Sequence, residues 1–322
     1  AYFDNSATTA VCRSAADAAL NAMTTVFGNP SSLHSVGYEA EQLVSDARQR
    51  IASALGCDAS ELIFTSGGTE ASNMAILSAA RLNKRRGRHI LSTAVEHPSV
   101  LAVFEALKKE DFEVTLLRPD RENGVTPAQI EENLRPDTVL VSMMLVNNET
   151  GMRFPVEHIR RIISKAGSSA LLHCDAVQAF GHLPLSLGHL GADLVSLSGH
   201  KLHAPKGVGA LYVKKGVRVS PLLLGGGQER GLRSGTENVP GIAAFAAAAD
   251  EAMACLHASR SRIAALRSAL LDALAALPAI VNSPADGAEH ILNFSLEGFR
   301  SETVMHFLAG AGVCVSAGAA CS

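Results

Sequence analysis

Residues 196–206 read SLSGHKLHAPK, and the rest of the chain is organised around this stretch. The apolar run at residues 192–197 precedes it, and a second run at residues 207–213 follows it. Two strands therefore flank the stretch, and the first strand ends at three polar side chains: Ser198, His200 and Lys201. This set fits an imine-forming lysine amine with phosphate-binding neighbours. The alternative is a solvated lysine in a turn, and the other motifs must decide.

Apolar runs and amphipathic stretches alternate through most of the chain before this point. Residues 138–146, TVLVSMMLV, are nearly all apolar, as in a strand that is buried on both faces. Repeated strand–helix units predict an α/β fold with a mostly parallel sheet covered by helices. The expected strands are residues 61–66, 89–94, 112–117, 138–146, 170–176 and 192–197, and the expected helices are 38–55, 67–80, 98–108, 127–134 and 156–166.

The character of the sequence changes after Pro240. An alanine-rich helix is expected at residues 242–277 with a weak break near 257–259, followed by a strand at 291–296, a helix at 302–310 and a strand at 313–316. We expect a large domain of residues 14–240 and a small α+β domain made of residues 1–13, an extended arm, plus 241–322. The small domain is short of elements, so we expect a C-terminal piece to be absent from it.

Composition argues against a nucleic-acid-binding, membrane-spanning or secreted protein. The 322 residues are 47% hydrophobic, enough for a large core, and the net charge of −3 argues against nucleic acid as a direct partner. We expect no transmembrane span and no signal peptide, because no long uninterrupted apolar run exists and the first residues are polar. The six cysteines form no CxxC pair, which fits a reducing cytoplasm. No metal site is expected, because strand geometry separates Cys174 from its neighbours His173 and Asp175.

Polar residues follow the expected strands one after another. In an open parallel sheet, ligands bind beyond the carboxyl ends of the strands, where these residues would gather. A Gly-Gly-Thr turn at residues 67–69 opens a helix and can approach an oxyanion, although an ordinary tight turn explains it equally well. The other residues at strand ends are His97, Asn148, Asp175 and Gln178, with Ser198, His200 and Lys201.

Together these residue types describe a site for pyridoxal phosphate. Lys201 would form the imine, and Asp175 would keep the pyridine nitrogen protonated so that the ring accepts electrons. His97 would lie over the ring, Gln178 and Asn148 would face its hydroxyl side, and the phosphate would meet three side chains: Thr69, Ser198 and His200. Each residue alone has an ordinary explanation, such as a helix cap for Asp175, a surface histidine for His97 or a turn former for Asn148.

Several motifs resemble the cysteine desulfurases of the NifS/IscS type, which are fold-type I pyridoxal-phosphate enzymes related to the class V aminotransferases. The resemblance runs in order from residue 2 to residue 321 and rests on FDNSATT, FGNPSS, FTSGGTEASN, EHPSV, VNNETG, CDAVQ, SGHKLHAPKGVGALYV, GGGQERGLRSGT and VSAGAAC. It implies that Lys201 is the Schiff-base lysine, His97 the ring-stacking histidine and Asp175 the pyridinium partner. It also implies roles for Gln178 and Asn148 at the ring and for Gly68, Thr69, Ser198 and His200 at the phosphate. Thr236 would reach the phosphate of a neighbouring subunit, which implies a homodimer.

The resemblance also implies the reaction. Cys321 matches the family's catalytic cysteine, and SAGAAC resembles the longer-loop group that serves iron–sulfur assembly. A thiolate on a flexible loop of small residues can attack the sulfur of L-cysteine and then carry it to an acceptor protein, such as an iron–sulfur scaffold. Lys201 would remove the α-proton, and His97 would help to move protons. Cys314 lies in an expected strand and reads as a small core residue.

Other functions stay open at this point. A selenocysteine lyase or an aminotransferase of the same fold is the nearest alternative, and a non-catalytic sulfur-assembly subunit is a further one. The acceptor could be an iron–sulfur scaffold, a tRNA-thiolation protein or a nitrogenase-specific assembly protein. The family's carboxylate-binding arginine belongs to a C-terminal segment that this sequence does not contain, so neither Arg230 nor Arg233 is assigned that role.

Overall fold

The computed structural model describes residues 1–121 and 124–318. Its main feature is a seven-stranded sheet with the strand order β1-β7-β6-β5-β4-β2-β3. Strands β2 to β6 run parallel, and β7 is antiparallel to both of its neighbours, β6 and β1. The bounds are β1 Leu62–Thr65, β2 His89–Thr93, β3 Glu113–Leu117, β4 Thr138–Met144, β5 Leu171–Asp175, β6 Leu194–Ser198 and β7 Gly209–Val213. The predicted mostly parallel α/β sheet is confirmed.

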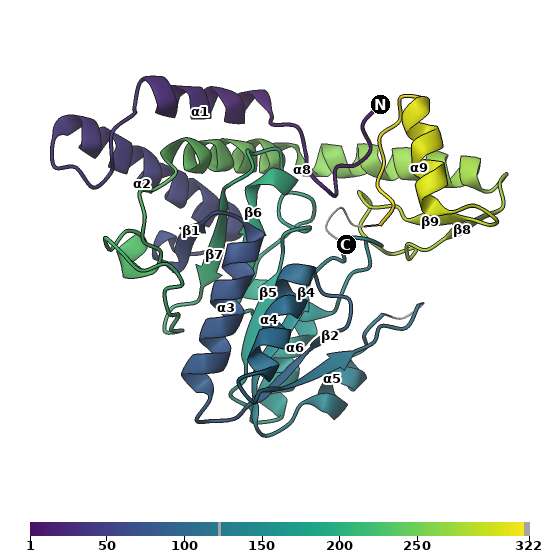
Figure 1. Cartoon of the computed structure of the whole chain (residues 1–322), viewed down its shortest axis with the longest axis horizontal. Coiled ribbons are helices and arrows are strands. Elements are labelled where there is room, and N and C mark those ends of the chain that lie inside the picture. Colours follow the sequence, from purple (N-terminus) through teal and green to yellow (C-terminus); the bar gives the residue numbers. More distant parts are fainter. Residues whose placement is uncertain (122–123, 319–322) are drawn as a thin grey trace.

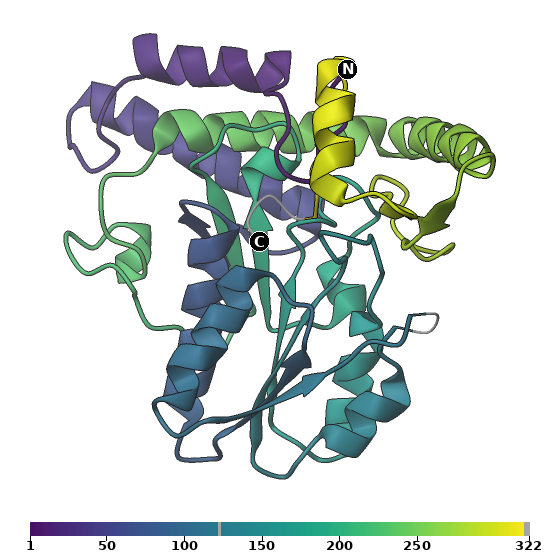
Figure 2. The same cartoon turned by 45° about the vertical axis from the view of Figure 1, so that its right-hand side comes forward.

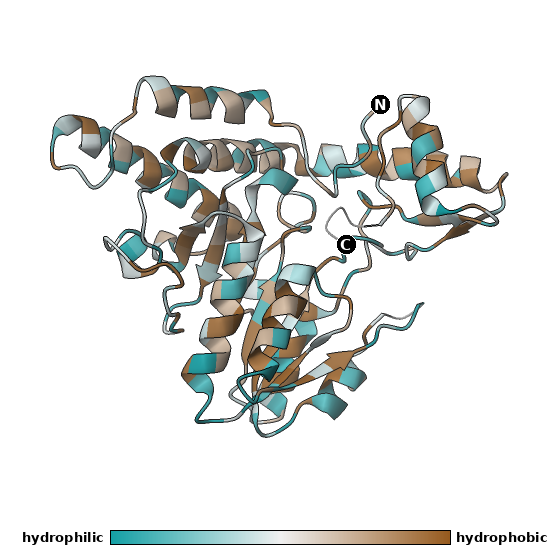
Figure 3. Ribbon diagram, in the orientation of Figure 1, coloured by the Kyte–Doolittle hydropathy of each residue, from teal (hydrophilic) through white to brown (hydrophobic). Residues whose placement is uncertain are grey.

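Helices cover both faces of this sheet (Figure 1). On β1, Ile63 packs into one hydrophobic cluster and Phe64 into another, because successive side chains of a strand point to opposite faces. The Ile63 face is covered by α3 (Gly68–Asn83) and α4 (Pro98–Lys108), and the Phe64 face by α2 (Ser35–Leu55), α6 (Val156–Lys165) and part of α8. Figure 3 shows hydrophobic strands at the centre and hydrophilic outer turns. The remaining helices of this region are α1 (Arg13–Thr24), α5 (Pro127–Asn133) and α7 (Leu187–Leu190).

Helix α8 (Val239–Leu274) is the longest element, with 36 residues. The predicted break near residues 257–259 is wrong, because His-Ala-Ser contains neither glycine nor proline and helical geometry continues through it. The early turns are rich in buried alanines and pack beside α1 and α2. Helix α8 is long and apolar enough to cross a membrane, but 61% of its most apolar window is buried inside the fold. Packing in the core accounts for this composition.

Beyond α8 the chain forms a small hairpin and one helix. Strands β8 (Ala279–Val281) and β9 (Phe294–Leu296) pair antiparallel, and α9 (Ser301–Gly310) stands near the N-terminus (Figure 2). The strand predicted at 313–316 is wrong, because only a single bridge forms there, between Cys314 and Tyr2 of the arm. Cys314 is exposed, which also corrects its prediction as a core residue. The division into domains at residue 240 stays a prediction.

Candidate active site

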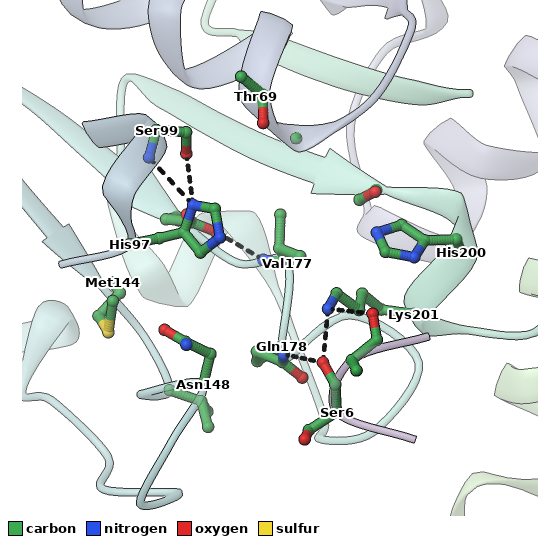
Figure 4. A pocket seen from close by; sticks show the side chains of 15 residues that line it. Ser6, Thr69, His97, Ser99, Met144, Asn148, Val177, Gln178, His200 and Lys201 are labelled. Carbon is green, nitrogen blue, oxygen red and sulfur yellow. Dashed lines mark hydrogen bonds between the residues drawn. The ribbon is translucent and has the colours of Figure 1, made fainter. Parts of the chain in front are cut away.

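A cavity of about 150 Å³ opens where five strands, β1, β2, β4, β5 and β6, reach their carboxyl ends. Side chains from all five strand ends meet there, as the sequence predicts (Figure 4). The predicted residues that line it are Gly68, Thr69, His97, Asn148, Asp175, Gln178, Ser198, His200 and Lys201. The other lining residues are Ser6, Ala7, Ser99, Met144, Val146 and Val177, which the sequence analysis did not single out.

Lys201 projects into the cavity from the short 3₁₀ turn Gly199–Lys201 that follows β6. Its Nζ atom donates hydrogen bonds to the backbone oxygens of Ser6, at 2.5 Å, and Ala7, at 2.8 Å. The Nε2 atom of Gln178 donates to the same Ser6 oxygen at 2.9 Å (Figure 4). The N-terminal arm therefore forms one wall of the site. The sequence does not predict that the arm lines the site, because the arm contributes backbone oxygens and no characteristic side chain.

Asp175 is the last residue of β5, and its residue surface is only 8% exposed. Burial raises the pKa of its carboxyl group to about 6, although a hydrogen bond from the Val177 N–H and the charge of Lys201 oppose this. The Val177 nitrogen lies 2.9 Å from Asp175 Oδ1, which fixes the orientation of the carboxyl group. A protonated ring nitrogen beside this carboxyl group would favour its ionised form. The site is therefore suited to holding a cationic ring.

His97 is the N-cap residue of α4, directly before Pro98. Its Nδ1 atom accepts a hydrogen bond from the Ser99 backbone N–H at 3.1 Å, and the Ser99 hydroxyl lies 2.8 Å from the same atom. Burial and the charge of Lys201 lower the pKa of His97. Because Nδ1 accepts from a backbone N–H, the proton of the neutral ring sits on Nε2. His97 thus presents a face and a proton-bearing nitrogen to the cavity.

The N-terminus of α3 lies at the opposite side of the cavity from Asn148 (Figure 4). A Cβ atom on Gly68 would lie 2.7 Å from Cγ2 of Val177, so only glycine fits without displacing its neighbour. The free N–H groups of a helix start favour an anion here. Ser198 and His200 complete this end, and burial lowers the pKa of His200 to about 4, so its ring is neutral at neutral pH. The arrangement fits a phosphate group.

Two predicted residues are not among the described residues that line this cavity. Thr236 is exposed in the loop before α8 and does not line it, and Cys321 lies outside the described residues. The loop's arginines serve the fold. Arg230 donates to the backbone oxygens of Ser60 and Leu62 at 2.7 and 2.6 Å, while Arg233 pairs with Glu70 at 2.9 Å. Neither lines the cavity, and no residue is assigned to the substrate carboxylate.

The donor set fits pyridoxal phosphate. One cavity contains a lysine amine, a buried carboxyl group for the ring nitrogen, an imidazole for the ring face and a glycine-opened helix N-terminus for the phosphate. Lys201 and Asp175 come from neighbouring strands, β6 and β5, so they reach the same ligand from adjacent positions. The roles of the individual residues remain predictions from these positions.

Known proteins resemble the whole chain. The family model "Aminotransferase class-V" matches residues 1–322. "Cysteine desulfurase IscS" of Methanosarcina thermophila is 40% identical over 100% of this chain and 80% of its own length, and "Cysteine desulfurase 2" of Trichormus variabilis is 44% identical with the same coverage. A solved structure described as a NifS-like protein superposes with a TM-score of 0.96 at 40% identity, covering 98% of this chain and 87% of its own. "SspA in complex with cysteine" gives a TM-score of 0.86 at 32% identity, covering 99% and 89%.

Fold, cavity and sequence agree on the class: this is a fold-type I enzyme that depends on pyridoxal phosphate. The chain belongs to the class V aminotransferase family, and its relatives there include cysteine desulfurases that match over its whole length. The family and cofactor predicted from the sequence motifs are confirmed.

Proposed function

We propose that this enzyme is a cysteine desulfurase that converts L-cysteine to L-alanine and carries the sulfur as a persulfide on Cys321. The observation that carries the proposal is the convergence of Lys201, Asp175 and His97 on one cavity, in a chain 40–44% identical to named cysteine desulfurases. The name of one solved relative, SspA in complex with cysteine, supports the choice of substrate.

Pyridoxal phosphate, when bound, supplies an electron sink for the substrate's α-carbon. The chain supplies the proton transfers and the nucleophile. The Lys201 amine removes the α-proton. The ionised carboxyl group of Asp175 would keep the ring nitrogen protonated. The Cys321 thiolate attacks the substrate sulfur, so that an S–S bond forms while the C–S bond breaks. The electron pair of the broken bond stays with the substrate carbon, which takes up a proton and becomes the methyl group of alanine, so the sulfur is oxidised as this carbon is reduced. His97, with its proton on Nε2, can return a proton to the product or take one from the substrate thiol.

The sulfur then passes to an acceptor protein, for which we propose an iron–sulfur scaffold or a thiolation protein. We further propose a cytoplasmic homodimer in which Thr236 reaches the phosphate site of the partner subunit. Two observations support the dimer: Thr236 is exposed and is not among the described residues that line the cofactor cavity, and Leu224 of the same loop is 84% exposed. The adjacent Leu222 and Leu223 are 36% and 44% exposed, and a contiguous exposed apolar patch is typical of surfaces that other proteins cover.

A selenocysteine lyase or an aminotransferase remains the alternative within the same fold. An aminotransferase has no need of a thiol at position 321 and releases a keto acid instead of alanine. A non-catalytic assembly subunit would not need Lys201 and Asp175 to share a cavity with a phosphate-type helix start. The products from L-cysteine and from L-selenocysteine distinguish these functions.

The variant Cys321→Ser tests the proposal, with Cys255→Ser, an exposed cysteine on α8, as the matched control. We expect Cys321→Ser to lose sulfide and alanine production by about 1,000-fold while it keeps the visible absorbance of the lysine-linked cofactor. Cys255→Ser should behave like the parent enzyme. Undiminished alanine production by Cys321→Ser, or a keto acid as the main product, would contradict the proposal.

A further inference from the structure

Two histidines stack on each other behind the active-site cavity. His182 follows β5 by seven residues, and His290 lies in the segment between β8 and β9. Their ring centroids are 4.3 Å apart, and the ring planes are inclined by 14°. Neither ring lines the cofactor cavity, so neither belongs to the group-transfer chemistry described above. The pair joins segments that are more than 100 residues apart in the sequence.

His182 is bound to the backbone of Lys201. Its Nε2 atom lies 2.8 Å from the Lys201 carbonyl oxygen. A carbonyl oxygen only accepts, so Nε2 carries the proton and donates it. Burial and the charges of Lys201 and His203 lower the pKa of His182, which keeps the ring neutral at neutral pH. The neutral ring therefore holds the backbone of the residue whose side chain enters the cavity from the other side.

His290 supplies the other ring of the stack. The backbone of Gln178 acts on the pKa of its ring, while its buried Nε2 atom has no hydrogen-bond partner among the described residues. Burial, with His182, Arg267 and Arg260 nearby, holds the pKa of His290 well below its usual range. The stacked pair thus connects the backbone of Lys201, through His182, to the segment between β8 and β9.

The segment that carries His290 is itself firmly held. Arg267 of α8 donates to the backbone oxygens of Pro284, at 3.0 Å, and of Ala288 and Ile291. The Ala288 N–H donates to Gly151 at 2.7 Å, three residues beyond Asn148 of the cavity. These bonds fix the backbone on both sides of His290 and leave its ring little freedom to move away from His182.

We propose that His182 and His290 are positioning residues, which fix the backbone of the Lys201 turn and so set the placement of the lysine amine toward the cofactor. The inference rests on the proposed role of Lys201 as the cofactor-linked amine. The hydrogen bond from His182 does the positioning, and the stack with His290 orients the donor ring. Without that donor, the Lys201 carbonyl loses a fixed partner, and the turn samples more conformations.

Two substitutions separate the hydrogen bond from the stack. His182→Phe keeps a flat ring against His290 but removes the donor, whereas His182→Gln keeps an N–H donor at a similar reach and removes the ring. His189→Phe is the matched control, because His189 is exposed on the nearby helix α7. The thermal midpoint of each variant reports any general loss of stability.

The first measurement is hydrogen exchange of residues 199–204 in the cofactor-free protein, where we expect His182→Phe to exchange about 5-fold faster or more. The second is the pH titration of the visible absorbance in the cofactor-loaded protein. Its midpoint should move by about 0.5 unit in His182→Phe, while kcat falls about 5- to 10-fold and KM stays within about 2-fold. His182→Gln should recover most of each effect, and His189→Phe should show none.

Unchanged exchange and an unchanged titration midpoint in His182→Phe, with only a lower thermal midpoint, would overturn the proposal and leave the pair a structural role. Failure of His182→Gln to recover any effect would overturn the part assigned to the hydrogen bond. Neither readout depends on sulfur transfer. If the loaded enzyme showed the expected shifts but released no alanine from L-cysteine, the proposed function would fail and the positioning role would stand.

Discussion

The Nζ atom of Lys201 lies 2.8 Å from the backbone oxygen of Ala7, 194 residues earlier in the chain. The neighbouring oxygen of Ser6 accepts from both Lys201 and Gln178. A segment before the first helix therefore closes the cavity over Lys201, for which we propose the link to the cofactor. Closing a site in this way excludes water from the linkage.

Removal of residues 1–8 should open that wall. We expect the loaded enzyme to lose its cofactor about 3-fold faster or more on dilution, because water gains access to the lysine linkage. The decay of the visible absorbance measures this rate. Ser6→Ala is the control, since the arm contributes its backbone oxygen, and it should retain the parent rate. Equal rates in the shortened and the parent protein would show that the arm does not protect the linkage.

Glu96 should make stability depend on pH. It is 4% exposed, its Oε1 accepts from Thr93 and from the Met144 N–H, and its Oε2 has no hydrogen-bond partner among the residues that the structure describes. Burial raises the pKa of its carboxyl group to about 8 from the ordinary value of 4.5. Between these values the folded protein holds a proton that the unfolded chain has lost. The Glu96 contribution to the free energy of unfolding therefore falls as the pH rises through this window.

Glu96→Gln removes this proton uptake while it keeps an acceptor for Thr93 and Met144. We expect the variant to gain about 1–3 kcal/mol relative to the parent between about pH 5.5 and pH 7.5. Urea unfolding of the cofactor-free proteins at both pH values measures the gain, with the exposed Glu132→Gln as control. A constant difference between Glu96→Gln and the parent would mean that Glu96 is ionised in the folded state.

Substitution of Asp175 should lower the activity without lowering the stability of the cofactor-free protein. Its pKa of about 6, raised from 3.8 by burial, means that ionising this carboxyl group disfavours the cofactor-free fold as the pH rises from about 4 to about 6. We expect Asp175→Asn to keep the Val177 contact and to be at least as stable as the parent at pH 7 without cofactor. Its kcat should fall about 100-fold or more, because a neutral amide does not hold the ring nitrogen protonated. A less stable cofactor-free variant would show that the ionised carboxyl group supports the fold.

Much of the cavity was predictable from the sequence, for a physical reason. His97 and Lys201 come soon after the ends of β2 and β6, Asp175 is the last residue of β5, and parallel strands bring their carboxyl ends to one edge. The strand predicted at 138–146 is β4, Thr138–Met144. Three positions therefore predicted the site before any contact was known, their residue types predicted the ligand, and the family resemblance agreed with it.

The parts of the site that were not predicted depend on contacts between distant segments, which leave no pattern in the sequence around either residue. The oxygens of Ser6 and Ala7 belong to the backbone, so no side chain signals their role near Lys201. The stacking of His182 on His290 joins distant segments in the same way. Helix α1 was not predicted, because five of its seven hydrophobic residues are small alanines, and only Ala15 and Ala22 are buried.

Helix α8 connects the core of the fold to the segment that carries His290. At 1.5 Å per residue its 36 residues form a rod about 54 Å long. Its early turns are fixed in the core, where Ala244, Ala246 and Ala249 are fully buried, and its far turns carry Arg267, which donates to the backbone of the segment that contains His290. A methyl group added among those alanines therefore changes the direction of the helix, and Arg267, about 20 residues further along, moves with it.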